Sequence, residues 1–487
     1  MLKGSMQVMK RLFAVLWILG IAGHALVAGG GIAYAQSSQA EPPKQPRPEN
    51  ATPIKHFIFL MQENHSYDNY FGTYPRGDGI PADTCMPVDP FNPDVKDCVR
   101  PFRIGDNEVE LADPDHSDAT HELQYNDGKM DGFVYALNQR NQDGRLAMGY
   151  YDDSVLSYYW NVADEYVLFD KFFSSAAGGS FINHFYWVAG DSGEPKEGED
   201  LQALLARTPT IFDRLEEAGI SWKFYVQNYE PELTYRTVQN YPGNRASQVI
   251  WVPLLNIDRF LDNPELNSKI VNLNEYYQDL VDGTLPEVAF IVPSGPSEHP
   301  PSNIDSGQRF VKTLIQMLMQ SKYWSTSAFM WAYDDWGGWY DHVPPPKVDE
   351  HGYGFRVPAL LVSPYAKQGF VDSTQLDYTS ALRFIEDNWH LEPLAARDAA
   401  ANSIASAFDF EQPPRKATFL SYERMASSPK AGPNTNAIYA AYGTGLVLAA
   451  GFILMTVLRR DNHRRARRAQ QAQRQEPLPD TGADPGR

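Results

Sequence analysis

The chain alternates short apolar runs with segments of helical period, and this alternation constrains the fold more than any other feature of the sequence. The segments predicted as strands are 54–61, 220–225, 287–292, 328–333 and 356–362, and those predicted as helices are 210–218, 308–319 and 380–389. Such alternation is typical of an α/β domain with a mainly parallel sheet. In these domains the functional groups collect just beyond the carboxyl ends of the strands, so we expect a site there.

Polar side chains directly follow two of the predicted strands. Glu63 and Asn64 come after 54–61, and Asp334 and Asp335 come after 328–333. A single acid in a loop is ordinary, but two polar groups at the ends of core-like strands can converge on one point. Carboxylate and amide oxygens are the ligands that hard divalent cations prefer. The sequence therefore predicts a divalent metal ion at this edge of the sheet, without indicating which metal.

A third candidate is the sequence Gly178-Gly179-Ser180, which precedes an apolar stretch at 185–188 predicted as a helix. Backbone N–H groups at a helix N-terminus can stabilise a nucleophilic alkoxide or a bound phosphate. The glycines would allow a ligand to approach the backbone closely. The same tripeptide also occurs in flexible loops, so by itself it leaves both interpretations open.

Several of the 11 histidines lie near acidic residues, namely His116, His121, His299 and His342. A neighbouring carboxylate can orient an imidazole ring or raise its pKa, which suits acid–base chemistry. A structural role is equally compatible with each of these residues. His65 and His184 are equally compatible with hydrogen bonding inside the loops that hold them.

Composition argues against a disordered chain and against a protein with many membrane spans. Hydrophobic residues make up 43% of the chain and charged residues 21%, which is typical of a globular protein. The mean hydropathy of −0.43 argues against a protein with many membrane spans. The net charge is −19, and because both ends are basic the part between them is more acidic still. Such a surface repels phosphate backbones, so we expect no nucleic-acid partner.

Both ends of the chain carry membrane-targeting patterns. Basic residues, an apolar run and an Ala-Tyr-Ala site before Gln36 are typical of a signal peptide, although the run is also long enough for an uncleaved anchor. A second uncharged apolar run is followed by arginines, which mark the cytoplasmic side. We therefore predict a single-pass cell-membrane protein with an extracytoplasmic body. The predicted segments are a signal peptide 1–35, a Pro-rich linker 36–53, a folded body 54–410, a linker 411–436, a transmembrane helix 437–458 and a basic cytoplasmic tail 459–487.

The chain has two cysteines, Cys85 and Cys98, in a stretch rich in Pro and Asp. A close pair in an exported chain predicts a disulfide, here closing a loop beside the entrance to the site. Two free thiols would be the better interpretation in a cytosolic protein. Two cysteines alone do not complete a zinc site.

Several motifs, taken in their order along 54–395, resemble the bacterial phosphoesterase family that includes non-specific phospholipases C and certain acid phosphatases. The motifs are ENHSYD at 63–68, DHS at 115–117, GKMDGF at 128–133, EHPP at 298–301, the run 334–346 and RVP at 356–358. Each motif is weak by itself, but the ordered set is specific.

The resemblance implies an alkaline-phosphatase-like α/β/α sandwich that hydrolyses a phosphate ester with the help of a metal, with phospholipid as one candidate substrate. The body 54–410 would then be the catalytic domain. Carried over by position, the metal ligands would be Glu63, Asn64, Ser180, Asp334 and Asp335, with Ser180 also the nucleophile. The catalytic histidines would be His116, His299 and His342, and the substrate-binding residues Asn183, His184 and Asp131.

Two positions depart from the family pattern. The family usually has Asp-Glu where this chain has Asp334-Asp335, and it usually has Arg where this chain has His184. These departures leave open a non-catalytic, metal-stabilised surface protein that retains the fold. A sulfatase-type hydrolase is less favoured, because the sequence lacks the C/S-x-P-x-R pattern that such enzymes need.

Overall fold

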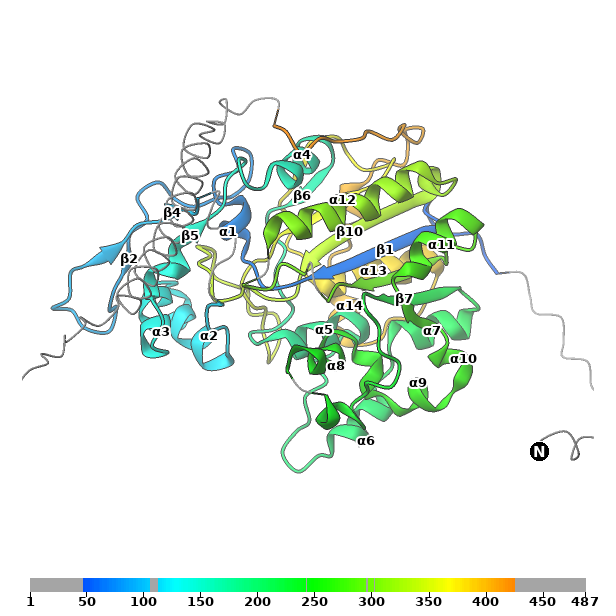
Figure 1. Ribbon diagram of the computed structural model, residues 1–487, viewed down its shortest axis with the longest axis horizontal. Coiled ribbons are helices and arrows are strands. Elements are labelled where there is room, and N and C mark those ends of the chain that lie inside the picture. Colours follow the sequence, from blue (N-terminus) through cyan, green and yellow to red (C-terminus); the bar gives the residue numbers. More distant parts are fainter. Residues whose placement is uncertain (1–46, 106–112, 242, 295–296, 302, 425–487) are drawn as a thin grey trace, which may run out of the picture. The chain divides into compact units, whose positions relative to one another are not determined.

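The computed structural model describes residues 47–105, 113–241, 243–294, 297–301 and 303–424, and within them the central sheet has eight strands (Figure 1). In spatial order these are β12 (Phe370–Asp372), β6 (Val167–Phe169), β11 (Ala359–Val362), β10 (Ser327–Tyr333), β1 (His56–Gln62), β9 (Val288–Val292), β7 (Trp222–Val226) and β8 (Ile270–Asn272). Seven of the eight run in one direction, and β11 runs against them. The predicted α/β fold with a mainly parallel sheet is confirmed.

Each of the five predicted strands and three predicted helices is present, with its ends within four residues of the predicted positions. The helix predicted from the apolar stretch after Ser180 is also present. Strands β6, β8 and β12 have three residues each and were not predicted. A run of three residues is too short to show a strand period.

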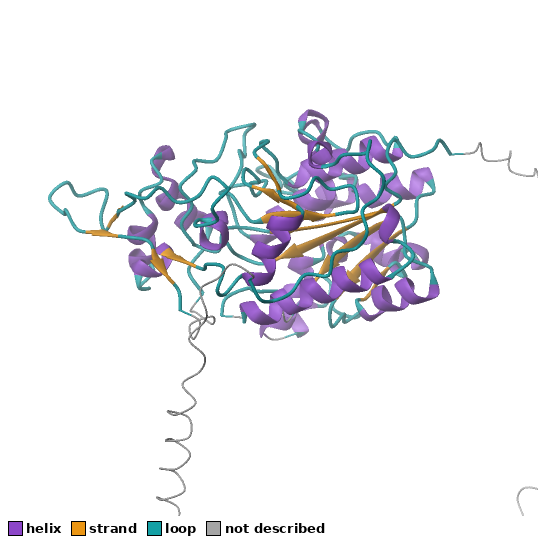
Figure 2. Ribbon diagram, turned by 90° about the horizontal axis from the view of Figure 1, so that it is seen from above, coloured by secondary structure: helices purple, strands orange, loops and turns teal. Residues whose placement is uncertain are grey.

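Helices cover both faces of the sheet, as Figure 2 shows. Helix α12 contacts α4 and α11 in one layer, whereas α13 contacts α5, and α5 contacts α7, in the other. The helices are α1 (Tyr67–Phe71), α2 (Asp118–Tyr125), α3 (Phe133–Gln139), α4 (Ser157–Glu165), α5 (Ser180–Ala189), α6 (Leu201–Arg207), α7 (Ile211–Ala218), α8 (Gln248–Trp251), α9 (Asp258–Asp262), α10 (Pro264–Asn267), α11 (Asn274–Asp282), α12 (Ile304–Gln320), α13 (Tyr378–Trp389) and α14 (Ala396–Ala400).

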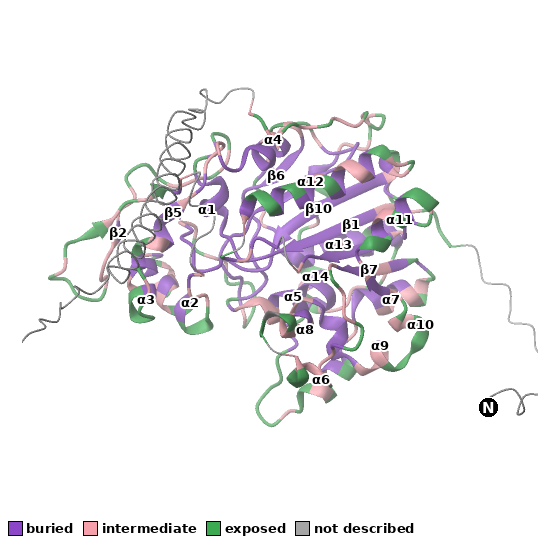
Figure 3. Cartoon of the chain, in the orientation of Figure 1, coloured by how far each residue is buried: buried purple, intermediate pink, exposed green. Residues whose placement is uncertain are grey.

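The central strands β9 and β10 are buried along their whole length, and Figure 3 shows β10 in the colour of buried residues. Strands covered on both faces read as continuous apolar runs, which is why the sequence shows them clearly. Helix α5 packs on this sheet through Trp187, whose ring stacks on Phe290 at 4.5 Å and meets Phe59 edge-on at 5.4 Å. This packing fixes the helix that begins at Ser180 against the strands that end in the acidic residues.

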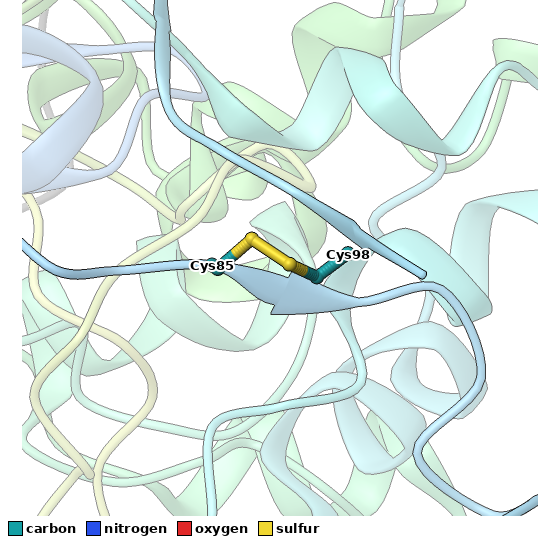
Figure 4. The surroundings of a disulfide bond; sticks show 2 residues. All are labelled: Cys85 and Cys98. Carbon is teal, nitrogen blue, oxygen red and sulfur yellow. A yellow bond between two sulfur atoms is a disulfide. The ribbon is translucent and has the colours of Figure 1, made fainter. Parts of the chain in front are cut away.

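A smaller apolar cluster is built mainly from residues that lie between α1 and α4 in the sequence. It combines side chains of α3 with Met86 and Trp336. The strands of this region are β2 (Met86–Pro87), β3 (Cys98–Val99), β4 (Phe102–Arg103) and β5 (Gly149–Tyr150). Figure 4 shows the disulfide between Cys85 and Cys98, whose Cα atoms are 5.4 Å apart, so the predicted bond is confirmed. The hairpin that it closes shares an apolar cluster with Trp336, the residue after Asp335.

The predicted signal peptide 1–35, transmembrane helix 437–458 and tail 459–487 lie outside the described residues. Among the residues that are described, no helix has the length and apolar character that crossing a membrane requires. Residues 411–424, which the sequence analysis places in a linker, contact the body. Arg415 forms an ion pair with Glu165 at 2.9 Å, and Arg424 pairs with Asp164.

Candidate metal centre and active site

The carboxyl ends of β1 and β10 lie side by side and bring four polar residues together. The two strands pair in parallel register along their whole length, so Glu63 and Asn64 emerge next to Asp334 and Asp335. The Asn64 side-chain amide donates to Asp335 Oδ1 at 2.9 Å, and the Asn64 backbone N–H donates to Asp334 Oδ1 at 3.2 Å. All four side chains are buried. The four predicted ligands from the strand ends therefore form one cluster, which we call the acidic cluster.

The backbone around the acidic cluster requires glycine at two positions. Asn64 has a left-handed φ of 63°, and Gly337 and Gly338 have φ values of 62° and 78°. A Cβ on Gly337 would lie 2.1 Å from the Asn64 carbonyl oxygen, and one on Gly338 would lie 2.8 Å from the Asp115 carbonyl oxygen. The turn after Asp335 can therefore touch both neighbouring loops only because it has no side chains at these positions.

Three buried oxygen atoms of the acidic cluster have no hydrogen-bond partner among the described residues. They are Glu63 Oε2, Asn64 Oδ1 and Asp334 Oδ2. Burial and the neighbouring Asp334 raise the pKa of Glu63 well above its usual value, and the same two causes raise the pKa of Asp335 to about 7. Buried carboxylates stay ionised side by side only when a positive charge offsets their repulsion. The donor set therefore fits a hard divalent cation.

His184 belongs to this cluster. Its side chain is fully buried, with Nε2 3.3 Å from Glu63 Oε1 and 3.7 Å from Asp334 Oδ2. Ligand atoms from these three residues lie within 4.8 Å of one another. Burial lowers the pKa of His184, which favours the neutral ring that binds metals. We predict from the sequence that His184 contacts the substrate, and in the structure its ring lies against two acids of a group that could hold a metal ion. The residue lies four positions after Ser180, on the same face of α5.

Ser180 is the first residue of α5 and lies beside the acidic cluster. Its Oγ is 3.5 Å from Asp335 Oδ2. Helix α5 has 10 residues and begins after Gly179, so its positive N-terminal end lies at the serine. A cavity of about 480 Å³ opens beside Ser180 and is also lined by Asp118 and His351. The predicted nucleophile therefore lies between a buried acidic cluster and a cavity open to solvent.

Asn183 shapes the loop that precedes Ser180. Its Oδ1 accepts a hydrogen bond from the Ala176 backbone N–H at 3.0 Å, and its Nδ2 donates to the Gly178 carbonyl at 3.0 Å. The side chain is fully buried. The sequence analysis predicts a substrate contact for Asn183, but the structure shows its polar atoms bonded to this loop.

His116 and His299 form a pair, with ring centroids 5.7 Å apart. Each ring places Nδ1 against a backbone carbonyl, that of Pro114 at 2.8 Å and that of Pro300 at 2.7 Å. A carbonyl can only accept, so Nδ1 carries the proton and Nε2 is the atom available to a ligand. Burial lowers the pKa of His116, but Asp335 and the Pro114 carbonyl outweigh it and raise this pKa to about 9. Asp335 and the Pro114 carbonyl thus favour the protonated form of the His116 ring.

His342 lies in a second cluster, with Asp68, Asp341 and Arg356. Its Nδ1 is 2.7 Å from Asp68 Oδ2, and this hydrogen bond, outweighing burial, raises its pKa. The buried Arg356 guanidinium donates to Asp68 at 3.2 Å and to Asp341 at 2.9 Å. The sequence analysis gave Arg356 no function, although it lies in the RVP motif. The structure thus separates His342, paired with Asp68, from the pair formed by His116 and His299.

The remaining candidates have local partners. Asp131 Oδ1 accepts from Asn126 at 2.6 Å, just before α3 begins. His121 stacks on Phe355 with ring centroids 4.3 Å apart, and burial lowers its pKa to about 4. His65 Nδ1 is 2.8 Å from the Asn69 side-chain oxygen. These contacts describe packing and loop structure.

Comparisons with known proteins find related sequences over most of the chain. The model of the Phosphoesterase family matches residues 54–392. Phospholipase C B of Mycobacterium tuberculosis is 29% identical over 443 residues, covering 79% of this chain and 83% of the relative. Non-specific phospholipase C1 of Arabidopsis thaliana is 26% identical, covering 75% and 72%. Among solved structures, a phosphonate monoester hydrolase of Agrobacterium radiobacter is similar with a TM-score of 0.36 at 9% identity, covering 73% of this chain and 77% of that one.

Proposed function

Because the chain belongs to the phosphoesterase family, we propose that it is a metal-dependent phosphoesterase of the phospholipase C type with Ser180 as its nucleophile. The observation that carries this proposal is the position of Ser180. Its Oγ lies 3.5 Å from Asp335, beside a buried donor set that fits a cation and at the start of a helix. The names of the curated relatives support a phospholipid as the substrate.

Glu63, Asn64, Asp334, Asp335 and His184 would hold the cation, because their polar atoms converge in one buried place. A divalent cation bound there would polarise a phosphoryl oxygen and lower the pKa of the serine hydroxyl. The like-charged carboxylates would then remain ionised together. Their orientation is fixed by the backbone of the strand ends and by the two glycines of the turn.

In the proposed reaction, Ser180 Oγ forms a bond to phosphorus while the bond from phosphorus to the leaving alcohol breaks. The hydroxyl proton passes to water, because the cation would lower the pKa of the serine hydroxyl and would keep the Asp335 carboxylate ionised. His116, in the protonated form that Asp335 favours, gives the proton that the departing alcohol needs. The neutral His116 then takes a proton from water, which attacks the phosphoserine, and Ser180 regains a proton from water as the phosphate product leaves.

The backbone amides at the start of α5 are the donors that we assign to the phosphate oxygens. Asn183 keeps the preceding loop in place through its hydrogen bonds to the Ala176 N–H and the Gly178 carbonyl. This arrangement offers fixed N–H groups to an anion without a guanidinium at position 184. His299, whose ring centroid lies 5.7 Å from that of His116, is the second ring that we assign to the substrate.

The test uses the full chain in detergent with a panel of phosphate monoesters and diesters, including diacyl phospholipids, with and without a chelator. We expect hydrolysis of phospholipids to diacylglycerol, loss of turnover with the chelator, and a phosphoserine at Ser180 detected by mass spectrometry after rapid quenching. Hydrolysis of monoesters alone would indicate a phosphatase. Cation binding with no turnover on any ester would indicate the non-catalytic surface protein instead.

We also propose that the body is anchored outside the cytoplasm. The apolar run at 437–458 followed by arginines supports this, as does the export pattern at 1–35. Protease added to intact cells should remove the body and leave the tail 459–487 protected. A body that resists protease until the cells are lysed would refute this topology.

A further inference from the structure

Glu298 is a fully buried acid that the proposed reaction does not use. Its carboxylate accepts hydrogen bonds from the hydroxyl groups of three tyrosines, Tyr70 at 2.6 Å, Tyr159 at 2.5 Å and Tyr333 at 2.6 Å. The side-chain amide of Gln62 donates to the same carboxylate at 3.3 Å. Four donors from four places in the chain therefore converge on one side chain.

Two of these donors are the last residues of the two strands that lead into the acidic cluster. Gln62 precedes Glu63, Tyr333 precedes Asp334, and the register of β1 and β10 places Gln62 opposite Tyr333. Successive residues of a strand point to opposite faces of the sheet. Gln62 and Tyr333, which hydrogen bond to Glu298, are therefore adjacent in sequence to Glu63 and Asp334, which would bind the cation, but point to the other face of the sheet.

The backbone on either side of Glu298 is tied to the same strand end. The Ser297 carbonyl accepts from the Glu63 backbone N–H at 3.0 Å, and the Glu298 carbonyl lies 3.0 Å from His65 Nε2. Glu298 has a left-handed φ of 70°. A Cβ on Gly307 of α12 would lie 2.1 Å from the Glu298 side chain, so this helix approaches closely only because it has glycine there.

A carboxylate suits this place better than a neutral side chain of the same shape. All four side-chain partners of Glu298 are hydrogen-bond donors, and a carboxylate accepts on both of its oxygens. A glutamine would instead present an N–H group to one of these donors. Burial raises the pKa of Glu298 to about 7, partly offset by the tyrosine hydrogen bonds. An acid buried in this way is costly to fold.

We propose that Glu298 is a positioning residue that sets His299, the next residue, against the ends of β1 and β10. This inference rests on the proposed function, because His299 matters only if the site turns over a phosphate ester. Through Gln62 and Tyr333, Glu298 fixes the strand ends, and through its own backbone it fixes the histidine. Displacement of a reacting group by about 1 Å can cost about 100-fold in rate.

The first experiment compares Glu298→Gln with the wild type as full chains in detergent. We expect kcat to fall about 10- to 100-fold with KM and bound metal unchanged. Tyr159→Phe removes one of the four hydrogen bonds and should lower kcat in the same direction by a smaller factor. The matched control is Asp279→Asn, a buried acid of α11 that accepts from Tyr225 at 2.6 Å, and it should keep the wild-type kcat. Wild-type kcat in both Glu298→Gln and Tyr159→Phe would overturn the proposal.

A second measurement does not depend on activity. The histidine ring resonances of the full chain are recorded by NMR, and the His299 signal is identified by its loss in His299→Gln. Glu298→Gln should shift this signal, while Asp279→Asn should not. An unmoved signal would overturn the positioning role even in a protein with no turnover. A shifted signal together with no hydrolysis of any phosphate ester would instead overturn the proposed function.

Discussion

His184→Ala should weaken cation binding and remove most of the stability that the cation adds. His184 lies at the centre of the donor set, with Nε2 3.3 Å from Glu63 and 3.7 Å from Asp334, and its ring is fully buried and neutral. If the ring is a ligand, alanine removes a donor that the surrounding oxygens cannot replace. If the ring only packs beside the carboxylates, alanine leaves the donor set complete.

The expected size follows from binding linkage. Losing a residue that merely orients a metal ligand costs about 10- to 100-fold in affinity, so losing a ligand should cost about 100-fold or more. At a cation concentration of about 100 times the wild-type Kd, the cation stabilises the folded protein by about 2.7 kcal/mol. A site weakened about 100-fold gives about 0.4 kcal/mol at the same concentration. The cation-dependent stabilisation should therefore fall by roughly 2 kcal/mol.

The assay is thermal and chemical unfolding with chelator and with each of several divalent cations, the effective one being identified on the wild type. The control is His121→Ala, which also removes a buried imidazole; this ring stacks on Phe355 and is not a member of the donor set. Both variants should lose stability with chelator because each leaves a cavity. Only His184→Ala should lose the difference between cation and chelator. If it keeps the full wild-type difference, the ring is not a ligand.

Three further changes have definite outcomes. Replacing Cys85 and Cys98 by serine should cost about 3 kcal/mol in denaturant unfolding, since their separation is 13 residues, and no loss would contradict the loop-entropy estimate. Asp335→Ala should stop turnover as Ser180→Ala does, but it should also release the metal. Asp335→Glu should keep or raise activity. Full activity in Asp335→Ala would show that Asp335 is an ordinary loop acid and not a metal ligand. Burial raises the pKa of Glu386 from 4.5 to about 9. The unfolded chain releases this proton at a lower pH than the folded protein does. The free energy of unfolding therefore falls as the pH rises between those two values, by up to about 1.4 kcal/mol per pH unit. Glu386→Gln should remove this slope, which is measured by denaturant unfolding at pH 6 and pH 8.

The strands and helices could be predicted because buried segments consist mainly of apolar residues, which the sequence shows directly. Strands β9 and β10 are covered on both faces and are therefore apolar without interruption. The direction of β11 could not be predicted, because an antiparallel strand between β6 and β10 has the same apolar residues as a parallel one. It depends on where the chain returns to the sheet.

The acidic cluster could be predicted from the positions of its members at the ends of two strands. The grouping of His184 with it could have been foreseen from the helical spacing to Ser180, but only once both were known to lie on one helix. The separate partners of His342 depend on Arg356, which lies 14 residues later in the same connection between β10 and β11. Contacts of this kind arise from tertiary packing and leave no period in the sequence.

The order of strands in the sheet also determines when, during synthesis and folding, the cation-binding residues can come together. Strand β1 lies between β9 and β10, so its neighbours on both sides are made long after it during synthesis. Asn64 and Asp335, which hydrogen bond to each other, are 271 residues apart in the chain. Pairings across such separations form slowly, and until then β1 is an apolar segment without partners. The donor set for the cation is thus among the last parts to assemble, and cation binding would report the completion of folding.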